Sequence, residues 1–131
     1  MTTILLCADT DVERISSQVA SITTLPLQTN AVQIFVYHVF RTDDDEIDAS
    51  NLKSVTHATE LLTEAGFNVE VIQSNGDAVR KILDTAAEVD ADMISIAGRK
   101  RSPTGKALFG SVAQQVTLRS ELPVLFCSVS E

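Results

Sequence analysis

Five short apolar runs alternate along the chain with longer stretches in which apolar residues recur at helical spacing. Most of the runs are nearly continuous and rich in β-branched residues, a pattern typical of strands that are buried on both faces of a parallel sheet. The runs predict strands over residues 3–8, 32–40, 69–73, 93–97 and 124–129.

The stretches between these runs predict four helices. Amphipathic patterns cover residues 12–22, 52–65 and 79–89, and a shorter helix is expected from Ser111 to about Arg119. Strands and helices therefore alternate, and parallel strands need right-handed crossovers. No internal repeat or linker interrupts the pattern. We expect one α/β domain over residues 1–131, an open doubly wound parallel five-stranded sheet with helices on both faces.

Length and composition agree with a globular domain. The chain has 131 residues, of which 44% are hydrophobic and 21% are charged, so a largely disordered chain is excluded. No apolar run approaches the roughly 18 residues that a membrane helix needs, so we expect no membrane insertion. The start of the chain lacks the features of a secretory signal, and we expect a cytoplasmic protein.

The charge balance limits the classes of partner that the protein is expected to bind. Eighteen acidic residues against ten basic ones give a net charge of −8. Nucleic acids and anionic membranes bind clustered positive charge, so we expect neither as a partner. Only four residues are lysine, whereas ten are aspartate, which favours a salt-rich, halophilic cytoplasm where salt screens the repulsion. An ordinary acidic protein is the alternative.

Candidate catalytic groups are few. Cys7 and Cys127 both lie in apolar runs and are interpreted as buried free thiols, with a disulfide or redox pair as the alternative. His38 ends an apolar strand and is interpreted as a structural histidine. The sequence has no GxSxG elbow, no Walker loop and no cluster of metal ligands.

Ligands of open α/β sheets bind beyond the carboxyl ends of the strands. At this edge Gly110 and Ser111 begin the last predicted helix. Glycine allows close approach to the backbone, and the free N–H groups of a first helical turn bind phosphate. Four of the ten basic residues lie just before this helix, at positions 99, 100, 101 and 106. We therefore predict an anion site here, with chance clustering on a solvated loop as the alternative.

One acidic residue and four short motifs stand out along the chain, and they are Asp9, Ala-Asp-Met-Ile at 91–94, Ala-Gly-Arg-Lys-Arg-Ser at 97–102, Gly-Ser-Val-Ala at 110–113 and Leu-Pro-Val-Leu at 122–125. They resemble the motifs of the universal stress protein family. The run from residue 98 to 112 is similar to the variant of haloarchaeal members, which agrees with the acidic composition. The resemblance covers the whole chain in element order and is most specific in the last 40 residues.

The resemblance implies strand order 3-2-1-4-5, as in adenine nucleotide alpha hydrolase-like folds, and usually a homodimer. One branch of the family binds ATP through Gly, two residues, Gly, nine residues, Gly, and then Ser or Thr. Gly110 and Ser111 match the end of this motif, whereas Ala97 and Lys100 stand at its earlier glycine positions. Either Gly98 supplies the close approach after a shift of one residue, or nucleotide affinity is weakened or lost.

The resemblance also implies roles for residues around a nucleotide. Asp9, with the Ala8 backbone, would lie near the adenosine moiety, and Val39 would border the adenine. Asp9 has a plain alternative, which is to cap the first helix together with Thr10 or Asp11. Around the ribose and phosphates the resemblance implies Ala97, Gly98, Arg99, Lys100, Gly110, Ser111 and Val112.

The function implied by the resemblance is that of a sensor or regulator in the stress response that binds ATP, with Mg²⁺. We expect slow ATP hydrolysis at most, because no general base is evident. The apolar last strand would be an edge that pairs with a second copy, and the regulated protein is not identified by the sequence. The alternative is a nucleotide-independent dimer that works through protein–protein interaction.

Overall fold

The computed structural model describes residues 1–41, 48–98 and 110–127. Five parallel strands form one sheet in the order β3-β2-β1-β4-β5, which confirms the expected fold class and strand order. The strands are β1 (Thr2–Cys7), β2 (Val32–Phe40), β3 (Asn68–Asn75), β4 (Met93–Ala97) and β5 (Val124–Cys127).

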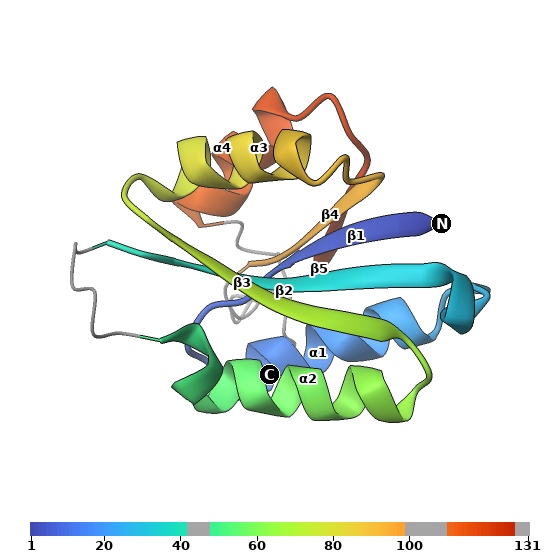
Figure 1. Ribbon diagram of the computed structural model, residues 1–131. Helices are drawn as coiled ribbons and strands as arrows, with labels where there is room; N and C mark the ends of the chain where they lie inside the picture. The colour runs from blue at the N-terminus through green and yellow to red at the C-terminus, as the bar shows by residue number, and fades with distance from the viewer. Residues whose placement is uncertain (42–47, 99–109, 128–131) are drawn as a thin grey trace, which may run out of the picture.

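Helices cover both faces of the sheet (Figure 1). The first pair, α1 and α2, lies on one face, and the second pair, α3 and α4, lies on the other. None of the described helices is long and apolar enough to cross a membrane. The helices are α1 (Val12–Thr23), α2 (Lys53–Glu64), α3 (Ala78–Glu88) and α4 (Ser111–Arg119), with short 3-10 turns η1 (Thr29–Ala31) and η2 (Ala49–Asn51).

The sheet separates two apolar cores. Ile4 and Leu6 of β1 pack into the core beneath α1 and α2, whereas Leu5 packs into the core beneath α3 and α4. All three side chains are fully buried. This two-sided burial explains why the strands are continuous apolar runs, since neither face of the central strand meets water.

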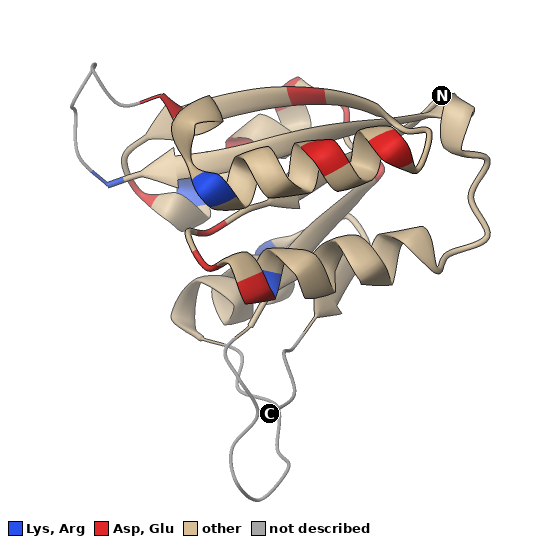
Figure 2. Cartoon of the chain, turned by 90° about the horizontal axis from the view of Figure 1, so that it is seen from below, with Lys and Arg blue, Asp and Glu red and all other residues tan. Residues whose placement is uncertain are grey.

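Residues of both charge signs belong to the first helical pair (Figure 2). Glu13 and Arg14 belong to α1, and α2 contributes Lys53, Glu60 and Glu64. Among the described residues, this face therefore has no block of charge of one sign.

The ends of two strands differ from the prediction. β3 runs from Asn68 to Asn75, longer than the predicted 69–73, because it pairs with β2 over its whole length. β1 ends at Cys7, whereas the prediction included Ala8. The predicted end of β5 at residue 129 lies outside the described residues, as do most of the predicted loops over 41–49 and 98–109.

The crossovers place a crevice between β1 and β4. The chain leaves β1 for α1 on one face, and β4 is followed by α4 on the other face (Figure 1). Neighbouring strands whose connections leave on opposite faces part at their carboxyl ends, and this switch point is where open α/β sheets hold ligands. The fold thus places the end of β1 at the centre of any ligand site.

The turn after α2 generates a stability prediction. Gly66 has a φ of +99°, and a Cβ added there would lie 2.9 Å from Thr29 Oγ1. We expect Gly66→Ala to lower the free energy of unfolding by about 1–3 kcal/mol, because it combines left-handed backbone strain with a clash. Urea unfolding followed by circular dichroism measures this loss. Glu64→Ala, at an exposed helical position, is the control and should change stability by less than about 0.5 kcal/mol.

Candidate functional site

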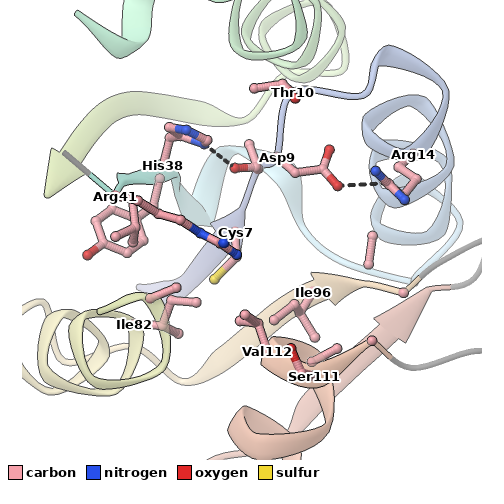
Figure 3. Close-up of a pocket in the computed structure, with 18 of the residues that line it drawn as sticks. Cys7, Asp9, Thr10, Arg14, His38, Arg41, Ile82, Ile96, Ser111 and Val112 are labelled. Carbon is pink, nitrogen blue, oxygen red and sulfur yellow. Dashed lines mark hydrogen bonds and ion pairs between the residues drawn. The ribbon is translucent and has the colours of Figure 1, made fainter. Parts of the chain in front are cut away.

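A cavity of about 460 Å³ opens at the carboxyl ends of β1, β2 and β4 (Figure 3). Its volume lies in the range of small-molecule and cofactor sites, about 300–1,000 Å³. The structure brings together the predicted site residues that it describes, and they are Ala8, Asp9, Val39, Ala97, Gly98, Gly110, Ser111 and Val112. The other two predicted residues, Arg99 and Lys100, lie outside the described residues.

One wall of the cavity is the backbone of Val39. Ala8 N–H donates to the Tyr37 carbonyl at 2.8 Å, so Tyr37 directs its backbone groups toward β1. Alternate residues of a strand face the same neighbour, and Val39 therefore also faces β1, but beyond its end. Within the described part of the chain, neither the N–H nor the C=O of Val39 has a hydrogen-bond partner. These two groups offer a ligand one donor and one acceptor side by side.

Asp9 stands where the chain leaves β1, and its carboxylate is held in place. Asp9 Oδ1 accepts a hydrogen bond from Asp11 N–H at 2.9 Å. Asp9 Oδ2 lies 2.7 Å from Arg14 Nε in an ion pair that is drawn as a dashed line in Figure 3. Asp11, not Asp9, caps α1 by accepting from Arg14 N–H, so Asp9 supports the cap only through Asp11. The Asp9 carboxylate keeps further lone pairs for a ligand.

The opposite end of the cavity is the start of α4. Gly110 is the N-cap of this helix and has a φ of +75°, a conformation that favours glycine. The N–H groups of the first turn have no partner inside a helix, and Ser111 and Val112 bring theirs to the cavity. This end is suited to an anion, as predicted for Gly110 and Ser111.

Gly98 lines the cavity and is buried, next to Ala97. Its N–H donates to the Cys127 carbonyl at 2.8 Å, which ties the end of β4 to the end of β5. Ala97 stands at the first glycine position of the family motif, so Gly98 is the residue at which this edge has no side chain. The close approach of a ligand at Gly98 stays a prediction.

Several lining residues are absent from the sequence-based site. The sequence could have indicated Arg14, because it is the only Lys or Arg among the first 40 residues. His38 was interpreted as structural, and it does bind a backbone carbonyl, but it also lines the cavity. The other lining residues that Figure 3 labels are Cys7, Thr10, Arg41, Ile82 and Ile96. Cys7 and Thr10 flank the predicted Ala8 and Asp9, whereas only the tertiary structure brings Ile82 of α3 to this edge.

The residues that line the cavity combine charged and apolar side chains. Its charged groups are Asp9, Arg14 and Arg41, and apolar side chains such as Ile82 and Ile96 separate the polar ends. The described residues contain no group of three or more His, Cys, Asp or Glu side chains that could hold a metal ion. The geometry defines an α/β domain with a switch-point cavity for an elongated polar ligand.

Comparisons place the chain in a family. The family model described as Universal stress protein family matches residues 19–128, and the chain belongs to this family. A universal stress protein of Mycolicibacterium smegmatis is 40% identical over 65 residues, which are 49% of this chain and 50% of that protein. The chain thus spans about half the length of this curated relative.

Solved structures agree with the fold. A universal stress protein from Archaeoglobus fulgidus superposes with a TM-score of 0.78 at 29% identity, covering 97% of this chain and 98% of that one. A second structure from Archaeoglobus fulgidus, in complex with dAMP, has a TM-score of 0.74 at 23% identity over 97% and 98% of the two chains. At 23% identity, the comparison with the second structure is evidence for a shared fold only.

The two cysteines, of which Cys7 lines the cavity, yield a prediction. Both are free, as expected, but half-buried; burial raises the pKa of the Cys7 thiol to about 12 and also raises that of Cys127. Only the thiolate reacts, so at pH 8 native Cys7 should alkylate roughly a thousand-fold more slowly than a thiol with pKa 9.0. Iodoacetamide labelling read by peptide mass spectrometry measures this rate. Protein unfolded in guanidinium is the control, and equal native and unfolded rates would contradict the assignment.

Proposed function

We propose that the cavity binds an adenine nucleotide and that the protein uses this binding as a sensor or regulator in the stress response. The proposal rests on one observation, which is that two chemically different ends face the same cavity. The unpaired backbone of Val39 forms one end, and the glycine-capped start of α4 forms the other.

The Val39 end fits a base. Adenine presents an amino donor next to a ring-nitrogen acceptor, and the C=O and N–H of Val39 are the complementary pair. Asp9 adds an acceptor nearby, which suits the hydroxyl groups of a ribose. Apolar side chains between the two ends, such as Ile96 and Val112, provide a surface for the flat faces of a base and sugar.

The α4 end fits phosphate. Free N–H groups in the first helical turn and the positive end of the helix dipole both favour an anion. The Archaeoglobus fulgidus relative in complex with dAMP supports a ligand that has a base at one end and phosphate at the other. We extend the proposal to ATP with Mg²⁺, because Arg99 and Lys100 follow Gly98 in the sequence and favour several phosphates.

The proposal is for binding without fast chemistry. A neutral Cys7 thiol is a poor nucleophile. We therefore expect slow ATP hydrolysis at most. A shift of loop or surface on binding would carry the signal to a regulated protein whose identity stays open.

The assembly and setting are part of the same proposal. β5 is an edge strand whose four residues are all half-buried, so we propose that it pairs with β5 of a second copy in a homodimer. The acidic, lysine-poor composition favours a salt-rich cytoplasm.

Calorimetric titration of the protein with Mg-ATP in molar KCl tests the site. The wild type should bind saturably, and ligand at a hundred times its Kd should stabilise the fold by about 2.7 kcal/mol. Gly110→Val should weaken binding roughly a hundred-fold, because it distorts the start of α4 and costs two or more charge-assisted hydrogen bonds.

Gly76→Val is the matched control. Gly76 also has a positive φ, +126°, but it does not line the cavity, so this variant should lose stability and keep its affinity. Unchanged affinity in folded Gly110→Val would remove α4 from the site. If the wild type shows neither heat nor stabilisation, the nucleotide-independent dimer becomes the better hypothesis.

A further inference from the structure

Three consecutive backbone carbonyls at the end of β1 are each bonded by a side chain from a different element. Residues 7–9 supply the carbonyls, and the donors are Gln18 of α1, His38 of β2 and Ser54 of α2. Gln18 and Ser54 are almost completely buried, at 0% and 1% exposure. We call these three side chains the carbonyl clamp.

His38 takes the place of a strand partner. Its Nδ1 lies 2.6 Å from the Ala8 carbonyl oxygen, and since a carbonyl only accepts, Nδ1 is the donor. In a continuing parallel ladder this carbonyl would instead accept from Val39 N–H, because Ala8 N–H already donates to the Tyr37 carbonyl. The imidazole thus satisfies Ala8 without using the backbone of Val39.

Ser54 and Gln18 hold the carbonyls on either side. Ser54 Oγ donates to the Asp9 carbonyl at 2.6 Å, which ties the turn after β1 to α2. Gln18 Nε2 donates to the Cys7 carbonyl at 3.2 Å, which ties the last residue of β1 to α1. A buried carbonyl without a partner is costly, so these bonds fix where the backbone turns away from β2.

We propose that His38 is a positioning residue, which keeps the N–H and C=O of Val39 unpaired and directed at the base of a bound nucleotide, and that Ser54 supports it by holding the turn after β1. The proposal rests on the proposed function for its ligand, but its structural core concerns the ligand-free protein. Neither residue needs to touch the ligand. His38 acts by occupying the Ala8 carbonyl, which would otherwise accept from Val39 N–H, and Ser54 acts by holding the Asp9 carbonyl in the turn after β1.

Amide hydrogen exchange of the ligand-free protein, followed by NMR, tests the structural core. In His38→Ala the Val39 N–H should bond to the Ala8 carbonyl, so its exchange should slow by about ten-fold or more relative to Tyr37, an internal reference within the ladder. His38→Asn keeps a donor near the Nδ1 position, and its Val39 exchange should stay close to that of the wild type.

His57→Ala is the matched control for loss of a histidine. His57 Nε2 lies 3.0 Å from Ser16 Oγ between α2 and α1, and His57 does not line the cavity. This variant should leave Val39 exchange unchanged. If His38→Ala does not fold, His38→Phe provides the same test, because it keeps an aromatic ring and removes the Nδ1 donor to the Ala8 carbonyl.

Calorimetry with AMP and with adenosine tests the consequence for binding. His38→Ala should weaken both ligands equally, by about ten-fold for one or two lost hydrogen bonds, whereas His38→Asn and His57→Ala should bind as the wild type does. An equal loss for both ligands marks the base end, since a phosphate-end defect would spare adenosine. Unchanged Val39 exchange in folded His38→Ala, or affinity that His38→Asn fails to restore, would overturn the proposal. If the wild type binds neither ligand, the proposed function fails, and the exchange experiment alone decides the structural core.

Discussion

The backbone hydrogen bonds at the end of β1 are the constraint on which the site depends. Up to Cys7 the strand has partners on both sides, β2 and β4. β2 then continues to Phe40 and pairs with β3, but β1 has turned away, so the inner edge of β2 faces empty space at Val39. The cavity is the space that one more residue or two of β1 would fill. Buried side chains must therefore satisfy the carbonyls that the turn leaves without strand partners.

The remaining polar groups of the cavity follow from this turn. The chain that leaves β1 immediately starts α1, which places Asp9 beside Arg14 in the first helical turn. Across the cavity, α4 starts at a glycine in a left-handed conformation, so its first N–H groups also face the gap. Acceptors and a backbone donor lie at one end, anion-binding N–H groups lie at the other, and apolar side chains separate them. A nucleotide has the same division along its length.

Prediction from sequence succeeded where burial decides structure. The central strands are apolar on both faces, and their positions were predicted to within one residue for β1, β2 and β4. The strand ends were less accurate, since pairing with a neighbour sets where an edge strand such as β3 begins and ends. In the site, the resemblance supplied the motif residues. The resemblance did not identify Arg14 or His38 as residues that line the cavity. Their partners are the Asp9 carboxylate and a carbonyl 30 residues away, and only the folded structure shows these contacts.

The sequence by itself determined the order of strands and helices, the two-sided burial of the sheet and the glycine start of α4. These features follow from local patterns of apolar residues and from the backbone freedom of a single residue. Only the tertiary structure decided where β1 stops, which carbonyls the side chains of α1, β2 and α2 satisfy, and which backbone groups of β2 stay open. Those outcomes depend on hydrogen bonds between segments far apart in the chain, and such geometry exists only once the elements have packed.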